Sequence, residues 1–264
     1  MPSFRELLLS QPYLLGTFVS FNDPYSAQIL ARCGFDWLMV DMEHSPLSPA
    51  EMTAMAHSTV AASGGNCSPI IRVPSHGVEW IKWALDSGAG GIIIPMVNSK
   101  KEVEAIVQRA LYPPAGQRSY GPFRAPFADR RVTATMADYK EHTSSQVMVL
   151  PMIESTEGVA NAEDIMRADG VDGVFIGPVD LRHSLGLSGP DGNEPAYLAA
   201  LQRVLELGRR YGKPVGILGS PNWTARLVKM GFKFVMLAGG DAGILAEAAS
   251  ALLTSSRESI QLQA

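Results

Sequence analysis

Charged and acid–base side chains stand directly after several short apolar runs of this 264-residue chain. Residues 41–44, Asp-Met-Glu-His, follow one run, and Arg72 closes the next. Glu154 and Asp180 follow two later runs. Each of these residues alone is as ordinary in a structural role as in a catalytic one. If the runs are parallel strands of one barrel, however, all of these side chains reach the same rim, where barrel enzymes place their active sites.

Glu154 and Asp180 form a pair of hard oxygen ligands. Two carboxylates completed by water or substrate oxygens are typical of sites for Mg²⁺ or Mn²⁺, whereas structural zinc is held by Cys or His. The step Gly177-Pro178 opens a helix through Val179 and Asp180, so free backbone N–H groups there are expected to hold a carboxylate. The sequence thus predicts a divalent metal ion (Mg²⁺, Mn²⁺ or Co²⁺) beside an anion site.

Arg72, His44 and Asp41 supply the remaining chemistry. The guanidinium of Arg72 is a permanently charged planar fork that suits an oxyanion. Histidine is the residue type whose ordinary pKa suits a general acid–base, which makes His44 the candidate for this role, and Asp41 is near enough to orient it. We therefore expect these three residues to act on the substrate that the metal ion binds.

Eight short apolar runs, separated by stretches with helical spacing, are expected to position these residues. Continuous apolar strands that alternate with helices predict a parallel sheet covered on its outer side, and eight such units close into a (β/α)8 TIM barrel. We expect one domain over residues 1–264; an open doubly wound sheet is disfavoured because no G-x-G-x-x-G follows the first run. The expected strands are 14–19, 37–40, 70–73, 91–94, 147–152, 173–176, 215–218 and 234–237.

The clearest helical spacing is found in residues 49–62, 79–85, 101–110 and 196–211. Between the fourth and fifth strands, residues 112–131 show no clear element but contain several prolines, glycines, arginines and aromatic residues. A connection this long inside a compact domain is usually functional or disordered, and its composition favours a functional loop.

The overall composition excludes several kinds of partner. A net charge of −4 and a pI near 5.8 argue against nucleic acid or an anionic membrane as the main partner. No apolar run approaches the roughly 18 residues of a membrane span. The start of the chain makes a poor signal peptide, and Cys33 and Cys67 show no disulfide framework and no metal-ligand spacing. We expect a cytoplasmic enzyme with a small-molecule substrate.

Seven ordered segments resemble the class II pyruvate-dependent aldolases of the HpcH/HpaI family, over nearly the whole chain. They are Leu14-Leu15-Gly16-Thr17, Phe35-Asp36-Trp37, Asp41-x-Glu43-His44, Ile71-Arg72-Val73, Gly91-Ile92-Ile93-Ile94-Pro95-Met96, Ile153-Glu154-Ser155 and Phe175-Ile176-Gly177-Pro178-Val179-Asp180-Leu181.

This resemblance implies a role for each site residue. It implies that Glu154 and Asp180 bind the metal. Arg72 would stabilise the enolate oxygen, and His44 would handle the aldol proton. The backbone of residues 177–179, at Gly177 and Val179 on either side of Pro178, would hold the pyruvate carboxylate.

The resemblance also implies a role for Asp86, which matches a family acid that raises the basicity of the histidine. Asp86 precedes the fourth strand, at the opposite end of its own barrel, so it reaches a His44 only across a subunit boundary. The family forms hexamers with exchanged C-terminal helices, and we therefore expect a homo-oligomer, a hexamer. The apolar stretch 244–253 suits such packing, although its spacing also fits an eighth barrel helix that covers its own sheet.

The chain departs from the family pattern around the expected substrate. Met152 replaces a common Gln two residues before the metal-binding Glu, and Arg182 and His183 replace small residues. Near Arg118 the usual Arg-Gly is changed to Arg-Ser. Met152 and Arg118 are kept as candidate substrate-binding residues, and these changes affect the electrophile more than the pyruvate half.

Together these features predict a metal-dependent aldolase that cleaves or forms 4-hydroxy-2-oxo acids from a pyruvate enolate and an aldehyde. Two alternatives use the same enolate: an oxaloacetate decarboxylase resembling macrophomate synthase, and an acyl-CoA lyase, whose only basic landing patch would be Arg118, Arg124, Arg130 and Arg131. A barrel that only binds 2-oxo acids is the non-enzyme alternative. No lysine is placed for a Schiff base, so activation is expected to come from the metal.

Overall fold

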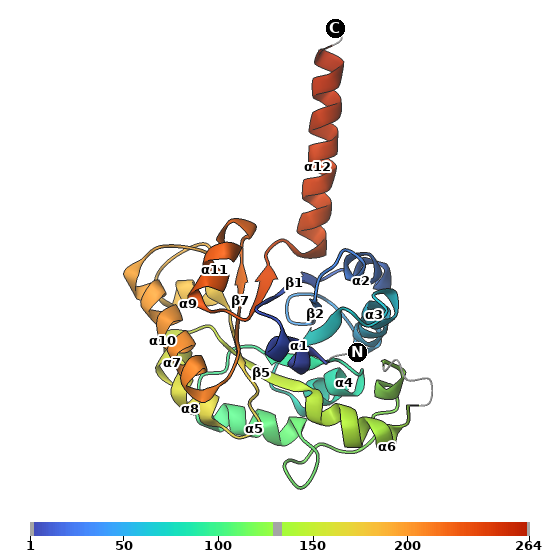
Figure 1. Ribbon diagram of the computed structural model, residues 1–264, viewed down its shortest axis with the longest axis vertical. Coiled ribbons are helices and arrows are strands. Elements are labelled where there is room, and N and C mark those ends of the chain that lie inside the picture. Colours follow the sequence, from blue (N-terminus) through green and yellow to red (C-terminus); the bar gives the residue numbers. More distant parts are fainter. Residues whose placement is uncertain (1–2, 129–133, 263–264) are drawn as a thin grey trace.

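Eight parallel strands form a closed barrel in the computed structural model, which describes residues 3–128 and 134–262. Each strand pairs with its neighbours in sequence order, and β1 also pairs with β8 (Figure 1). The strands are β1 (Leu14–Val19), β2 (Trp37–Asp41), β3 (Ser68–Arg72), β4 (Gly91–Ile94), β5 (Met148–Ile153), β6 (Val174–Ile176), β7 (Val215–Gly219) and β8 (Phe234–Leu237). The predicted TIM barrel is confirmed, with β1, β4 and β8 at the expected bounds and the others shifted by one or two residues.

Helices surround the barrel and connect its strands (Figure 1). They are α1 (Phe4–Ser10), α2 (Pro24–Ala31), α3 (Pro49–Ala62), α4 (Val78–Asp86), α5 (Lys100–Ala110), α6 (Met136–Asp138), α7 (Thr156–Ala160), α8 (Ala162–Arg167), α9 (Pro178–Ser184), α10 (Pro195–Tyr211), α11 (Thr224–Met230) and α12 (Gly240–Gln261), with short turns η1 (Ala125–Ala128), η2 (Tyr139–Thr143), η3 (Ser144–Gln146) and η4 (Pro221–Trp223). The four predicted helices are present as α3, α4, α5 and α10. Ser48 and Ser99 cap α3 and α5 through capping boxes with a glutamate at the third helical position.

Aromatic side chains fill part of the barrel interior. Trp37, Phe175 and Phe234 are fully buried, with ring centroids 5.8–6.3 Å apart. Phe4 of α1 packs on Trp37 and Phe234 at 5.9 and 5.7 Å, so the N-terminal helix belongs to the same core. Gly16 makes room for this layer, because a Cβ there would lie 2.4 Å from the Trp37 ring. The interior is therefore a packed core, and chemistry is confined to the rim.

The C-terminal helix α12 extends away from the barrel (Figure 1). Only Gly240 and Asp241, at its base, are buried. The eighth helix therefore does not cover its own sheet, and the predicted apolar stretch 244–253 is the middle of a longer exposed helix. Large apolar side chains are exposed along it: Ile244, Leu245, Leu252, Leu253 and Ile260. Within the described ranges, neither α12 nor another helix is both long and apolar enough to cross a membrane.

The predicted loop over residues 112–131 is irregular up to Arg124 and then forms the short turn η1. Two of its arginines, Arg130 and Arg131, lie outside the described residues. Arg118 is buried, whereas Tyr120, Phe123 and Phe127 are exposed.

Candidate active site

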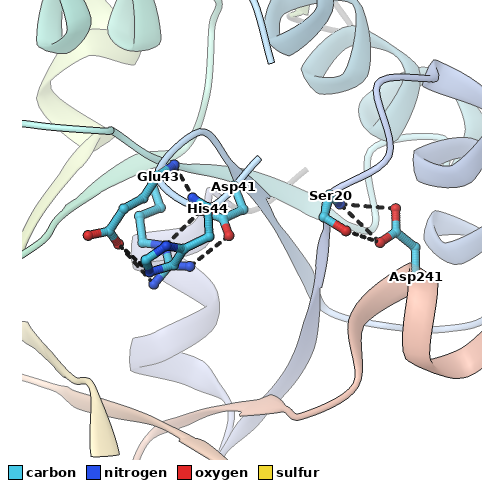
Figure 2. Close-up of polar contacts among 6 residues, drawn as sticks. Ser20, Asp41, Glu43, His44 and Asp241 are labelled. Atoms are coloured by element: carbon cyan, nitrogen blue, oxygen red, sulfur yellow. Dashed lines mark hydrogen bonds and ion pairs between the residues drawn. The ribbon is translucent and has the colours of Figure 1, made fainter. Parts of the chain in front are cut away.

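Asp41 and Arg72 form the centre of a polar cluster at the carboxyl ends of β2 and β3. The two residues are direct partners in the sheet register. Arg72 donates from Nε to Asp41 Oδ1 at 2.8 Å and from Nη2 to Oδ2 at 2.7 Å, a bidentate pair in which both side chains are buried. The pair fixes the plane of the guanidinium and leaves Nη1 directed to other groups. In the same region, Ser20 after β1 donates to Asp241 at the base of α12 (Figure 2). The backbone N–H of Phe21 donates to the same carboxylate.

Glu43 connects this pair to His44. Its Oε2 lies 3.1 Å from Arg72 Nη1 and 3.6 Å from His44 Nε2. Burial raises the pKa of Glu43 above its ordinary value, against the opposing charge of Arg72. The sequence indicated no role for Glu43, although its place after an apolar strand is the same signal that singled out its neighbours.

The imidazole of His44 is largely exposed, with 66% of the side chain accessible. Asp41 contacts His44 only through the backbone: Oδ1 accepts the His44 N–H at 3.4 Å and the Glu43 N–H at 3.1 Å. The expectation that Asp41 orients the imidazole is therefore corrected, because its carboxylate is committed to Arg72 and the ring faces Glu43 (Figure 2). An exposed imidazole at the rim is free to meet a substrate.

Glu154 follows β5 and is buried, at 3% relative exposure. Its Oε1 accepts the backbone N–H of Met96 at 2.7 Å, and no hydrogen bond within the described ranges ends on Oε2. Burial raises the pKa of Glu154 to about 7; the Met96 hydrogen bond and Arg72 oppose this shift, whereas the charges of Glu43 and Asp180 add to it. The rim therefore carries more negative charge than Arg72 neutralises.

Gly177 and its neighbours bring the expected substrate-binding backbone next to Glu154. A Cβ on Gly177 would lie 2.2 Å from Glu154 Oε2 and 2.6 Å from Met152 Cε, so a side chain at this position would displace the ends of both of these side chains. Pro178 is buried as the first residue of α9, and Val179 is partly exposed. The N–H of Gly177 is engaged with Ile153 O at 3.3 Å, so the N–H groups available to an anion are those of the first helical turn.

The residues present fit a divalent cation. Glu154 offers an oxygen without a hydrogen bond, and Asp180, exposed in the first turn of α9, is close enough to raise the pKa of Glu154. A cation between these carboxylates would neutralise the repulsion that raises this pKa. No set of three His, Cys, Asp or Glu side chains in the described part of the chain is grouped as a metal site. Two protein carboxylates with remaining positions for water and substrate oxygens suit Mg²⁺.

A family model described as HpcH/HpaI aldolase/citrate lyase matches residues 14–251. The chain belongs to this family. It is 35% identical over 243 residues to the hydroxypyruvate/pyruvate aldolase of Pseudomonas aeruginosa, covering 92% of this chain and 88% of the relative. It is 34% identical over 251 residues to the 5-keto-4-deoxy-D-glucarate aldolase of Escherichia coli O6:H1, covering 94% of each. The structure of macrophomate synthase matches with a TM-score of 0.87 and 26% identity, over 99% of this chain and 91% of that chain.

As a member of the HpcH/HpaI family, the chain is a pyruvate-type aldolase, a carbon–carbon lyase that acts on a small molecule. The two aldolase relatives differ in the substrates that their names give, so the family alone does not define the substrate of this HpcH/HpaI aldolase.

Asp86 and Arg118 of this HpcH/HpaI aldolase lie together, away from the rim. Arg118 Nη2 donates to Asp86 Oδ1 at 2.5 Å, and its guanidinium stacks over the Tyr112 ring at 4.5 Å. Asp86 ends α4, which precedes β4, so the pair lies at the amino ends of the strands. Within one chain, neither residue joins the cluster around Arg72 and Glu154, and a role for either in that cluster requires a second subunit.

Arg182, one of the departures from the family pattern, organises the connection between α9 and α10. The side chain is buried and donates to the carbonyl oxygens of Ser188 and Gly189 and to both carboxylate oxygens of Glu194. Its guanidinium also lies over the Tyr197 ring, 4.8 Å from the centroid. Arg182 therefore holds the loop that follows α9.

The raised pKa of Glu154 predicts a pH-dependent stability of the metal-free protein. Between its ordinary value of 4.5 and about 7, the folded chain keeps a proton that the unfolded chain has lost. The free energy of unfolding is therefore expected to fall by up to about 3 kcal/mol as the pH rises through this window, and to show no further change from Glu154 above it. Urea unfolding in a chelator at pH 5 and pH 8 measures this change. An equal fall in Glu154→Gln would contradict the assignment.

Proposed function

We propose that this aldolase cleaves and forms 4-hydroxy-2-oxo acids through a pyruvate enolate, with a divalent metal ion held by Glu154 and Asp180. The observation that carries the proposal is the buried Glu154 carboxylate, which has one oxygen fixed by Met96 and the other without a hydrogen bond from the described residues. Arg72 and Asp180 act electrostatically on this carboxylate, which supports a cation site beside the guanidinium and the first turn of α9.

Each residue of the rim has a distinct task in this proposal. The metal ion, when bound, supplies Lewis acidity that polarises the 2-oxo group. The guanidinium of Arg72 stabilises the negative charge on the enolate oxygen, with its orientation fixed by Asp41. The first-turn N–H groups of α9 hold the substrate carboxylate. His44 carries the proton of the C4 hydroxyl, and Glu43, whose Oε2 lies 3.6 Å from Nε2, helps to orient the imidazole.

A retro-aldol screen tests this function directly. We expect pyruvate release from one or more 4-hydroxy-2-oxo acids, 5-keto-4-deoxy-D-glucarate among them, that stops in a chelator and returns with Mg²⁺, Mn²⁺ or Co²⁺. Hydroxypyruvate with an aldehyde tests the donor that the name of the Pseudomonas aeruginosa relative gives. Turnover that persists unchanged in a chelator, or binding of 2-oxo acids without turnover of any substrate, would refute the proposal.

An oxaloacetate decarboxylase is the second candidate, favoured by the likeness to macrophomate synthase over nearly the whole chain. Oxaloacetate decarboxylation faster than every retro-aldol cleavage in the screen would select it. The acyl-CoA lyase alternative has less support. Of the arginines considered for its basic patch, Arg118 is buried against Asp86, and Arg124 shares a cavity of about 340 Å³ with Asp86.

We predict that no Schiff base forms during turnover. The lysines at strand ends are engaged elsewhere: Lys213 donates to the carbonyl oxygens of Met166 and Ala168, and Lys233 donates to those of residues 11 and 12. Lys100 is exposed on α5, beside Glu104. Borohydride added with pyruvate is expected to leave activity and protein mass unchanged by mass spectrometry. A pyruvate-dependent mass increase on any of the seven lysines would overturn the metal mechanism.

We also propose a homo-oligomer, a hexamer, assembled through α12. A 22-residue helix with exposed apolar side chains, including Leu252 and Leu253, is better satisfied in an interface than in water. Light scattering is expected to give about six times the 28.4 kDa chain mass. Leu252→Asp with Leu253→Asp should lower that mass, whereas Ser255→Asp on the same helix should not. A fully active wild-type monomer would contradict both the hexamer and any contribution of Asp86 across subunits.

A further inference from the structure

One peptide group, between Pro95 and Met96 after β4, is held from both sides. Its carbonyl oxygen, on Pro95, lies 2.7 Å from His76 Nε2. Its N–H, on Met96, donates to Glu154 Oε1 at 2.7 Å. A carbonyl oxygen has no proton to give, so the imidazole must be the donor, with its proton on Nε2. The hydrogen bonds thus run in one chain from His76 through the peptide to the Glu154 carboxylate.

The backbone at Met96 needs this support. Met96 has a φ of 51° and is the one non-glycine residue with positive φ in the described ranges. Residues with a Cβ avoid this left-handed region because of a steric clash, so the conformation persists only when its surroundings impose it. The Met96 side chain is 46% exposed, so its own burial does little to impose it. The hydrogen bond from Val97 N to Met152 O, at 3.1 Å, fixes the next peptide but not this one.

His76 is itself held in place. It lies in the turn between β3 and α4, and its carbonyl oxygen accepts a hydrogen bond from Arg109 Nη1 of α5. Arg109 is thereby tied to the turn that presents the imidazole. The support of the Pro95–Met96 peptide therefore comes from the turn after β3, through a side chain that is only partly exposed.

We propose that His76 is a positioning residue for the metal site. By holding the Pro95–Met96 peptide in its strained orientation, it keeps Glu154 Oε1 engaged and leaves Oε2 to the cation. The inference rests on the proposed function, in which Glu154 is a metal ligand. Groups that orient metal ligands typically contribute about 10- to 100-fold to metal affinity, and hydrogen bonds in a chain strengthen one another.

Binding of Mn²⁺, followed by the electron paramagnetic resonance of the free ion, tests this role without any turnover. His76→Leu removes the donor, and we expect its Kd for Mn²⁺ to rise about 10- to 100-fold. His76→Gln places an amide N–H where Nε2 stood and is expected to restore most of the affinity. Met96→Gly in the His76→Leu background should recover part of it, because glycine adopts positive φ without a steric cost.

His57→Leu is a matched control. His57 is also partly buried, and its Nε2 lies 3.0 Å from a carbonyl oxygen, that of Ser87 after α4, far from the rim. We expect His57→Leu to leave Mn²⁺ affinity unchanged, even where it lowers the melting temperature. If His76→Leu does not fold, His76→Asn takes its place, since the shorter amide does not reach Pro95 O.

Mn²⁺ binding by these variants distinguishes the positioning role of His76 from the role of Glu154 as a metal ligand. If His76→Leu binds Mn²⁺ as tightly as the wild type while Glu154→Gln does not, His76 has no positioning role, although Glu154 remains a ligand. A positioning role is equally contradicted if His76→Gln binds as weakly as His76→Leu. Wild-type protein that binds no Mn²⁺, or Glu154→Gln that binds it normally, would overturn the metal proposal and this inference with it.

Discussion

Replacing Glu154 by Gln is expected to abolish metal binding and to lower kcat/KM by at least about 10³-fold, which corresponds to about 4 kcal/mol of transition-state stabilisation. The amide is neutral and nearly isosteric, so the hydrogen bond from Met96 survives while the charge that attracts the cation is lost. Loss of one of two carboxylates also leaves Asp180 alone, exposed on the first turn of α9. The measurements are retro-aldol kinetics and Mn²⁺ binding on the same preparations.

Glu157→Gln provides the control for this substitution. Glu157 is exposed in the first turn of α7, three residues from Glu154. Its replacement by Gln changes the net charge by the same amount as Glu154→Gln. Its activity is expected to stay within about twofold of the wild type, as is usual for surface substitutions. Because burial alone makes the ionised Glu154 unfavourable, Glu154→Gln should also be no less stable than the wild type in a chelator. Full activity in metal-stripped Glu154→Gln would end the metal-dependent assignment.

Replacing Arg72 by Lys is expected to lower the rate of pyruvate C3 proton exchange by about 10²- to 10³-fold, although the positive charge is kept. The guanidinium binds Asp41 with two nitrogens and reaches Glu43 with the third. One ammonium group does not reproduce this fork, so either Asp41 is left buried without its partner or the cation withdraws from the enolate oxygen. Exchange of the C3 protons in deuterium oxide, followed by NMR, isolates enolate formation from aldehyde binding.

Arg203→Lys is the matched control for Arg72→Lys. Arg203 is exposed on α10 and donates to backbone carbonyl oxygens outside the rim. Its replacement is expected to leave proton exchange unchanged. Melting temperatures of both variants distinguish two effects of Arg72→Lys. Loss of the buried Arg72–Asp41 pair as a structural contact lowers the melting temperature, whereas loss of enolate stabilisation lowers only the exchange rate. An Arg72→Lys enzyme within a few-fold of the wild type would contradict the assigned role.

The rim could be predicted from the sequence because parallel strands share a direction. Once residues 37–40 and 70–73 were expected to be neighbouring strands, Asp41 and Arg72 had to reach the same edge, and the structure makes them register partners. The same geometry selected Glu154 and Asp180. The strand ends differ by one or two residues, because a continuous apolar run marks a buried strand without marking its last paired residue.

Other parts of the site depend on contacts that no local pattern encodes. The left-handed Met96 is set by His76 and Glu154, which are distant in sequence, and residue preference alone would place Met96 in another conformation. The pairing of Asp41 with Arg72 rather than with the imidazole of His44 depends on side-chain reach across two strands. The sequence could not predict the packing of α12, because its apolar spacing fits its own barrel and a neighbouring subunit equally well.

Asp241 couples the base of α12 to the catalytic rim. Its buried carboxylate accepts hydrogen bonds from the backbone N–H and the hydroxyl of Ser20, directly after β1 (Figure 2). It also accepts the backbone N–H of Phe21. In the proposed assembly, a subunit that packs on α12 would therefore also restrain the loop after β1. Packing of a subunit on α12 and ordering of the loop after β1 are then linked equilibria. Linkage is reciprocal, so each event stabilises the other by the same free energy. Protein concentration would then act on this aldolase as an effector does. Dilution would favour dissociation of the oligomer and, with it, a less ordered loop after β1.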